Sequence, residues 1–302
     1  RRDRVPGATL WTLTDGLETA TTNAVRPCGE TRLSKGLYDM NDGVFSPSIH
    51  TGSPWSMTTQ HGGPINALLM YGVESAALGT PKRVARLSVD ILRPVPREPL
   101  RLTTRILREG RRLAVVDAAL ERESDGMPVA VARAQLLKDR DDHKPLFPRA
   151  AEHIPTPNDS DEADLISESR RREGPPGFHL NIEMRHGMDK TGPIGWFTWS
   201  GELIIGLATS SAQRCAAICD LATIVSGRMR LSGSAGWDNK IRFEMLNTDT
   251  IIHFLRPPIG AWFAFHAPSI IDERGAGITQ APLYDENGAL GRVVQTMASN
   301  AP

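Results

Sequence analysis

One carboxylate of the sequence stands in a setting that favours chemistry. From Cys215 to Val225, Asp220 is the only charged residue in an apolar run. Burying an unpaired carboxylate costs on the order of several kcal/mol, so the residue needs partners or a function. A desolvated carboxylate is also a stronger base, as activation of a water molecule requires. We therefore predict Asp220 as a general base; the structural alternative is an ion pair with Arg256 or a hydrogen bond from a hydroxyl.

A second candidate feature is the run Gln60-His61-Gly62-Gly63, which precedes an apolar segment. The first N–H groups of a helix have no partner within the helix, and glycine lets a ligand approach closely. A helix N-terminus also favours developing negative charge. We expect Gly62 and Gly63 to polarise a carbonyl as an oxyanion site, with His61 and Gln60 as further substrate-binding candidates. The alternative is a turn that only starts the helix, beside a surface histidine.

The elements that must position these residues follow from hydrophobic periodicity. Pro64 to about Ala77 has apolar residues at helical spacing, and proline suits the first turn of a helix. Alternating segments separated by turn residues then predict four strands, at residues 85–91, 100–107, 113–120 and 129–137.

The second half of the sequence has the same order of elements. Ser210 or Ser211 is suited to cap a helix that extends to about Gly227. Four strand regions follow it, at residues 241–255, 261–271, 277–284 and 289–297. The sequence therefore predicts one apolar helix followed by an antiparallel meander, twice.

Two Arg-Pro to Gln intervals support a duplicated unit. Arg93 to Gln135 spans 42 residues and Arg256 to Gln295 spans 39. Between the halves, residues 139–178 are rich in Pro, Asp, Glu and Arg, which is typical of a linker. We predict an α+β fold with an N-terminal domain at 1–138, a linker at 139–178 and a C-terminal domain at 179–302. Each sheet would wrap around its own helix.

Several motifs, in order, resemble the acyl-CoA thioesterase II-like family of double hot-dog proteins. They are Pro54-Trp55, Gln60 to Pro64, Gly195 to Phe197, Ala217 to Ala222, Asn247 to Pro257, Leu283 to Gly288 and Val293 to Gln295. The resemblance covers most of residues 50–138 and 190–298. It implies a double hot-dog fold, with two tandem sheet-and-helix units, and hydrolysis of acyl-CoA to free acid and CoA.

The resemblance also implies a hydrolytic trio. The family has an Asp on the second helix, a Thr or similar residue on the next strand and a Gln on the last strand. Asp220 and Gln295 match, whereas Asn247 replaces the Thr. An Asn amide still holds a water but does not reproduce a hydroxyl. Thr248 is the neighbouring candidate, and a shift of one residue would turn it to the other face.

The two halves differ in chemistry. In the first half Gln135 matches Gln295, but Asn66 falls roughly where Asp220 falls in the second. Asn is not a general base. The comparison therefore predicts one base per chain, with the first half serving structure and acyl binding.

Composition bounds the partners. Lys plus Arg is 35 and Asp plus Glu is 35, so the net charge is zero and no nucleic-acid partner is expected. We found no metal-ligand spacing and no run of about 20 apolar residues. We expect no metal, no membrane and no cofactor except CoA as part of an acyl thioester substrate. Cytoplasmic location is expected because no signal-peptide core follows Arg1 to Arg4; a homo-oligomer and a place in lipid metabolism are implied by the family.

Three alternatives remain open. A hot-dog hydratase or dehydratase usually pairs an Asp with a His, and Asp220 has no such partner nearby in sequence. A non-catalytic acyl-CoA or acyl-carrier binding protein is favoured weakly by Asn247. A biosynthetic cyclase is neither favoured nor disfavoured. A serine hydrolase is disfavoured because no G-x-S-x-G elbow is present.

Overall fold

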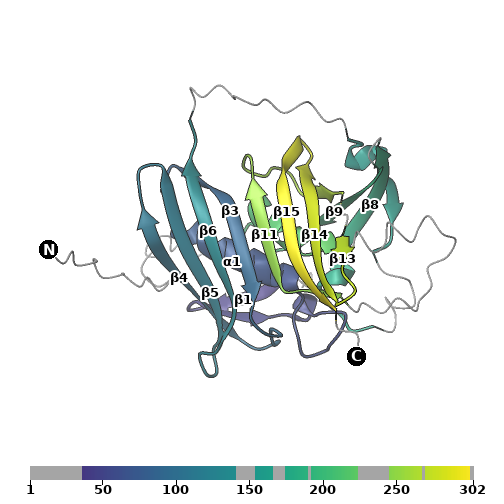
Figure 1. Cartoon of the computed structure of the whole chain (residues 1–302). Helices are drawn as coiled ribbons and strands as arrows, with labels where there is room; N and C mark the ends of the chain where they lie inside the picture. The colour runs from purple at the N-terminus through teal and green to yellow at the C-terminus, as the bar shows by residue number, and fades with distance from the viewer. Residues whose placement is uncertain are drawn as a thin grey trace, which may run out of the picture.

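One curved antiparallel sheet runs through the molecule. The computed structural model describes residues 36–140, 154–165, 174–189, 192–223, 245–266 and 269–299. Within them, the strands follow the order β1-β2-β4-β5-β6-β3-β11-β15-β14-β12-β9-β8-β7, and β10 and β13 pair with β15 and β14. Figure 1 shows the N-terminal strands on one side of this layer and the C-terminal strands on the other.

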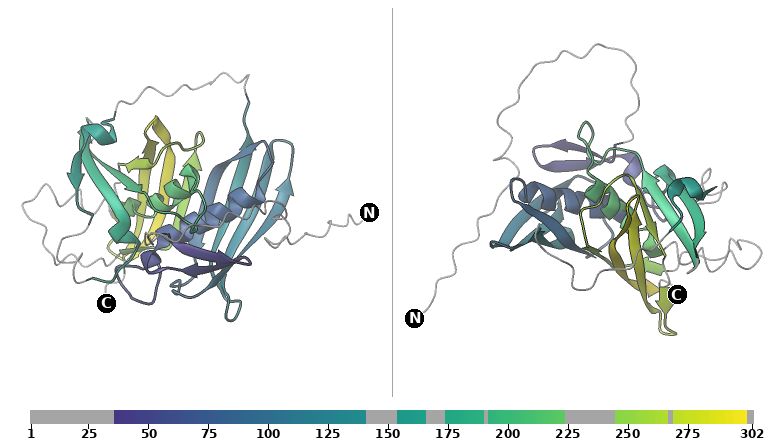
Figure 2. Two further views of the ribbon diagram at one scale, coloured as in Figure 1. Left: turned by 180° about the vertical axis from the view of Figure 1, so that it is seen from behind. Right: turned by 90° about the horizontal axis from the view of Figure 1, so that it is seen from above.

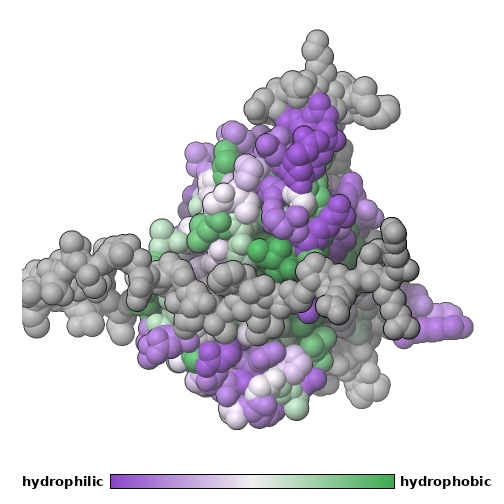
Figure 3. All heavy atoms as spheres, turned by 90° about the vertical axis from the view of Figure 1, so that its left-hand side faces the viewer, coloured by the Kyte–Doolittle hydropathy of each residue, from purple (hydrophilic) through white to green (hydrophobic). Residues whose placement is uncertain are grey.

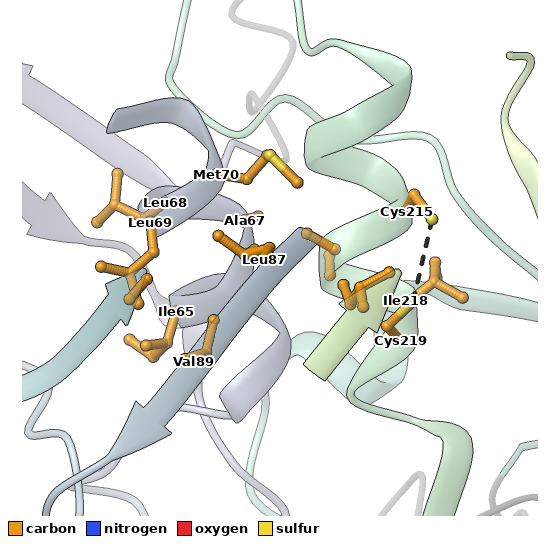
Figure 4. Packing of buried hydrophobic residues seen from close by; sticks show 14 of the residues in the cluster. Ile65, Ala67, Leu68, Leu69, Met70, Leu87, Val89, Cys215, Ile218 and Cys219 are labelled. Carbon is orange, nitrogen blue, oxygen red and sulfur yellow. Dashed lines mark hydrogen bonds between the residues drawn. The ribbon is translucent and has the colours of Figure 1, made fainter. Parts of the chain in front are cut away.

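The first half wraps a sheet around helix α1 (Gly62–Ala76). α1 buries Ile65, Leu68, Leu69 and Val73, the residues whose spacing predicted it, and packs on β3 to β6 (Figures 2 and 4). The strands are β1 (Tyr38–Asn41), β2 (Val44–Pro47), β3 (Lys82–Ile91), β4 (Leu100–Glu109), β5 (Leu113–Arg122) and β6 (Pro128–Lys138), and the 3-10 helix η1 is Ile49–Thr51. All four predicted strands of this half are present.

Alternation explains why these segments are strands. In β5 every second residue is buried and the others are partly exposed, as one face packs on α1 and the other meets solvent. The buried set is Ala114, Val116, Ala118 and Leu120.

The second half is built around helix α3 (Ser211–Cys219). Ser210 caps this helix because its Oγ accepts from the Gln213 N–H, and the Gln213 Oε1 in turn accepts from the Ser210 N–H. The strands are β7 (Asp161–Ala163), β8 (Ile182–Asp189), β9 (Gly192–Trp199), β10 (Met245–Asn247), β11 (Asp249–Phe254), β12 (Trp262–Phe265), β13 (Ser269–Ile271), β14 (Ala276–Asp285) and β15 (Gly288–Ser299), and η2 (Pro157–Asp159) and η3 (Phe178–Asn181) are 3-10 helices.

The halves join at two places. β3 pairs antiparallel with β11, from Asp249 opposite Asp90 to His253 opposite Arg86, which makes the two sheets continuous. Behind the sheet α1 packs on α3, as Figure 2 shows from the back. Because of this packing, the start of α1 lies against the end of α3.

Several predicted boundaries differ from the structure. The helix predicted to reach Gly227 ends at Cys219; helical backbone resumes at Ala222, and residues 224–227 lie outside the described residues. The strand predicted at 241–255 is broken at Thr248, and 261–271 contains two strands, β12 and β13. β1, β2, β7, β8 and β9 were not predicted.

The predicted linker contains packed structure. Ile154 and Leu165 are buried, and β7 adds to β8 at the edge of the C-terminal sheet. Polar composition concealed these few apolar anchors. The domain boundaries at 138 and 178 stay a prediction.

The molecular surface at the N-terminal edge of the sheet carries both hydrophobic and hydrophilic residues. In Figure 3 hydrophobic residues form separate patches among hydrophilic ones. No described helix has the length and apolar character needed to span a membrane.

Candidate active site

Asp220 lies at the junction of the two halves. It forms the C-cap of α3, and only 5% of the residue is exposed. Its carboxylate contacts side chains from two other elements, one from each half of the chain. The predicted buried carboxylate is therefore present, with partners.

Asn247 is the first partner. Its Nδ2 donates to Asp220 Oδ1 at 2.7 Å. Asn247 ends β10 opposite Met297, whereas Ile251 pairs with Val294, so the three residues between these pairs on one strand lie opposite two on the other. This extra residue is a β-bulge, which often re-aims side chains beside functional sites.

His61 is the second partner. Its Nδ1 lies 2.9 Å from Asp220 Oδ2, and the ring is buried. The rings of Trp55 and Phe178 lie 5.7 and 5.5 Å from it. The Gly63 N–H also approaches Nδ1, at 3.2 Å. One nitrogen does not accept from Gly63 and donate to Asp220 at once, and the shorter distance favours the Asp220 contact. His61 is thus not the surface residue weighed above.

Gly62 and Gly63 allow this close approach. A Cβ on Gly62 would lie 2.4 Å from Asp220 Oδ1. A Cβ on Gly63 would lie 2.6 Å from the Phe178 ring and 2.8 Å from the Ala217 carbonyl oxygen. The N-terminus of α1 therefore faces the Asp220 carboxylate, and its positive end stabilises negative charge there. The oxyanion role of the two glycines stays a prediction.

Gln295 is buried, and its side chain bonds to the main chain of Asp220 rather than to the carboxylate. Its Nε2 donates to the carbonyl oxygens of Cys219 and Asp220, at 3.3 and 3.4 Å, and to Thr250 Oγ1 at 3.0 Å. Its Oε1 accepts from the N–H and Oγ1 of Thr223. Gln295 thus holds the break after α3 in place. The Gln295 amide therefore positions the main chain around Asp220, and the hydrolytic role that the resemblance implies for Gln295 stays a prediction.

Thr248 and Gln60 lie apart from the carboxylate. Thr248 is exposed and its Oγ1 donates to the Thr296 carbonyl oxygen, because the bulge turns Asn247 inward instead. Gln60 accepts from the Tyr38 hydroxyl and donates to the Pro96 carbonyl oxygen, both at 2.7 Å. Gln60 therefore ties β1 to the loop before α1.

Two residues of the site were missed. Thr250 is buried and its Oγ1 accepts a hydrogen bond from Gln295. It lies three residues after Asn247, whereas residues on the same face of a regular strand are two or four apart, so alternation does not predict it. Thr223 follows the break after α3, and its N–H and Oγ1 both donate to Gln295 Oε1 on the last strand.

Of the structural alternatives for Asp220, the ion pair with Arg256 is wrong. Arg256 forms a two-pronged ion pair with buried Asp285, which also accepts from the N–H groups of Ile259 and Asn287. This pair raises the pKa of Arg256 above its ordinary value. Among the described residues, the side chains that bond to the Asp220 carboxylate are those of His61 and Asn247.

Asn66 and Gln135, the first-half residues matched by sequence to Asp220 and Gln295, do not occupy equivalent positions in the structure. Asn66 lies in the second turn of α1, whereas Asp220 caps the end of α3. Gln135 is half-buried between buried Ala134 and Leu136, so it faces away from the helix, unlike Gln295. The Arg-Pro to Gln intervals of the two halves differ by three residues, and an odd difference turns the Gln side chain to the opposite face of its strand.

Two hollows lie elsewhere. One of about 420 Å³ lies among β7, β8 and β9, and one of about 760 Å³ on the outer face of the N-terminal sheet. Asp220 lines neither. The described residues contain no group of three His, Cys, Asp or Glu side chains suited to a metal ion.

Comparison with known families gives two matches. The model of the acyl-CoA thioesterase N-terminal domain matches residues 51–137, and that of the acyl-CoA thioesterase C-terminal domain matches residues 149–299. No curated protein sequence matches the chain.

Solved structures share the fold. The chain is 16% identical to a conserved protein of unknown function with hot dog fold from Alicyclobacillus acidocaldarius, over 88% of this chain and 96% of that one, with a TM-score of 0.61. The chain is 19% identical to a protein from Novosphingobium aromaticivorans that is provisionally named a thioesterase, over 88% of this chain and 99% of that one, with a TM-score of 0.62. It is 15% identical to an acyl-CoA thioesterase II from Mycobacterium marinum, over 89% of this chain and 97% of that one, with a TM-score of 0.55. At these identities the likeness shows the fold alone, and it confirms the double hot-dog prediction.

Proposed function

Because the chain belongs to the acyl-CoA thioesterase family, we propose that it hydrolyses acyl-CoA thioesters with a water activated by Asp220. The observation that carries this proposal is the buried carboxylate held by Asn247 Nδ2 at 2.7 Å and facing the N-terminus of α1. A fixed, desolvated carboxylate is suited to remove a proton from water.

The chemistry needs one carboxylate. Asp220 takes a proton from water as the oxygen attacks the thioester carbonyl carbon, and the carbonyl oxygen becomes an anion. Collapse of this intermediate re-forms the carbonyl and breaks the carbon–sulfur bond. The CoA thiolate leaves and receives the proton from Asp220. The products are the free acid and CoA, and the carboxylate is regenerated.

Each neighbour has a task in this scheme. Asn247 holds the carboxylate in one orientation, and Gln295 fixes the backbone that carries it. The N–H groups of Gly62 and Gly63 lie at the positive end of α1, where an oxyanion is stabilised. The small-molecule substrate therefore meets residues of both halves.

The experiment is thiol release from a panel of acyl-CoAs, from acetyl to palmitoyl and with benzoyl. Asp220→Asn should lower turnover by at least ~10²-fold, the scale of general-base loss. Asp117→Asn is the matched control, since Asp117 pairs with Arg133 on the outer face of the sheet. Absence of thiol release with every substrate would reject the proposal.

A second function is favoured by one contact. His61 Nδ1 lies 2.9 Å from Asp220 Oδ2, the Asp–His pairing that hydration of an enoyl thioester or dehydration of a 3-hydroxyacyl thioester would use. Crotonyl-CoA separates the two functions. Loss of the enoyl absorbance without thiol release would establish hydration, whereas thiol release with the double bond retained would establish hydrolysis.

A further inference from the structure

Asn66 is a buried amide with no hydrogen-bond partner among the described residues. The residue has 0% exposure. Neither its Nδ2 nor its Oδ1 makes a hydrogen bond with the described residues. A buried amide that bonds to nothing is strongly disfavoured, so such a group in a native fold calls for a ligand or a water.

The position of Asn66 on α1 points it at the site. Around a helix of 3.6 residues per turn, Asn66 lies between Gly62 and Met70. Gly62 faces the Asp220 carboxylate, and Met70 points toward α3 in Figure 4. Asn66 therefore lies on the side of α1 that faces α3, about one turn from Asp220.

The direction of the side chain adds to this. Side chains on a helix lean toward its N-terminus, over the preceding turn. For Asn66 the preceding turn is Gly62 and Gly63, which carry no side chain to cover it. Its amide is thus directed toward the start of α1, where Asp220 lies against Gly62.

A second polar atom at this place also has no partner. The Nε2 of His61 is buried and makes no hydrogen bond with the described residues, although Nδ1 of the same ring contacts Asp220. The Asn66 amide and the His61 Nε2, neither of which has a hydrogen-bond partner among the described residues, therefore flank the carboxylate on the α1 side. Unsatisfied buried groups gathered at one place call for a shared polar partner, either a bound water or a ligand.

We propose that Asn66 Nδ2 donates the hydrogen bond that polarises the thioester carbonyl oxygen of the substrate. The inference rests on the proposed function and adds a side-chain donor to the α1 N–H groups. As water attacks, negative charge forms on that oxygen, and a donor fixed in a dry site stabilises the charge more than it stabilises the neutral carbonyl. The amide oxygen is then free to accept from a bound water. Asn66 would be a catalytic residue from the first half of the chain.

The test separates this role from a merely structural one. Asn66→Leu keeps the branched shape and removes the polar atoms. If the amide is only an unsatisfied core group, the variant should be more stable and equally active. If it is the carbonyl donor, the melting temperature should rise or hold while kcat falls by about 10²- to 10³-fold. Gln135→Leu, the same kind of change on the outer face, should leave kcat unchanged.

A second readout does not depend on turnover. A ketone analogue of acyl-CoA, with CH₂ in place of sulfur, is bound to each variant, and its carbonyl stretch is measured by infrared spectroscopy. The wild type should lower the stretch, and Asn66→Leu should return it toward the free value. Asn66→Ala serves in the same way if the Leu variant does not fold.

The outcomes are distinguishable. Equal kcat and equal stretch in wild type and variant would overturn the inference and leave hydrolysis standing. A wild type that releases no thiol, yet shows a stretch that depends on Asn66, would refute hydrolysis and retain the donor. Failure of the analogue to bind would overturn both.

Discussion

Replacing Gly62 by Ala should disable the site with little harm to the fold. The new Cβ would lie 2.4 Å from Asp220 Oδ1 and 2.8 Å from its Cγ. Ordinary contact begins near 3.4 Å, so the carboxylate must move by roughly 1 Å. That movement would break or stretch the contacts to Asn247 and His61, which are 2.7 and 2.9 Å long.

A displacement of this size has a calculable consequence. Misplacing a reacting group by 1 Å costs about 10²-fold in rate, which corresponds to about 2.7 kcal/mol. We therefore expect kcat/KM for acyl-CoA hydrolysis to fall ~10²-fold in Gly62→Ala. Stability should change little, because Ala is favoured over Gly in a helix by up to about 1 kcal/mol and offsets part of the strain.

The assay pairs thiol release with thermal unfolding. Gly72→Ala is the control on the same helix, since its Cβ would meet only Leu102 methyl groups, at 3.0 Å and beyond, and a Thr104 methyl at 3.2 Å. It should retain wild-type kcat/KM. A Gly62→Ala variant within threefold of wild type would refute the reasoning, because the carboxylate would then tolerate displacement.

Three further predictions concern partners of the site and of the fold. Asn247→Ala removes a hydrogen bond to a carboxylate, worth about 1.5–3 kcal/mol, so kcat/KM should fall about 10- to 100-fold; an unchanged value would deny Asn247 a role. Burial raises the pKa of Glu74 above its ordinary value of 4.5. The folded state therefore binds the proton more tightly, and this contribution to stability is lost as pH rises through the raised pKa. Glu74→Gln should gain stability relative to wild type as the pH rises above 4.5, measured by urea unfolding; a pH-independent difference would contradict this. Asp285→Asn should lower the free energy of unfolding by about 3 kcal/mol, the lower end for a broken buried pair because Arg256 is partly exposed. Chemical denaturation checks this, and a loss below 1 kcal/mol would argue against a structural ion pair.

Local pattern predicted much of the fold. The strands β3 to β6 were predicted within about three residues because each buries one face, and α1 because its apolar residues recur at helical spacing. β8 and β9 were missed because Met184, Trp196 and Trp199 occur among Gly and Pro residues without clear alternation. Such strands are stabilised by neighbours distant in sequence, and a local pattern carries no record of those neighbours.

The site was predicted in part for the same reason. Asp220 was apparent as a single charge in an apolar run, and Asn247 was predicted from its place in the ordered motifs that resemble the thioesterase family. The contact of His61 with Asp220 joins residues from different halves, and only the packing of α1 on α3 brings them together. Thr250 was hidden by the bulge, which shifts the inward face by one residue.

The most direct test of the account is thiol release by Asp220→Asn, with wild type alongside on the best substrate of the panel. General-base catalysis predicts a fall in kcat of at least ~10²-fold with an unchanged melting profile. A folded variant that retains wild-type kcat would contradict the account, because the water would then be activated by another group.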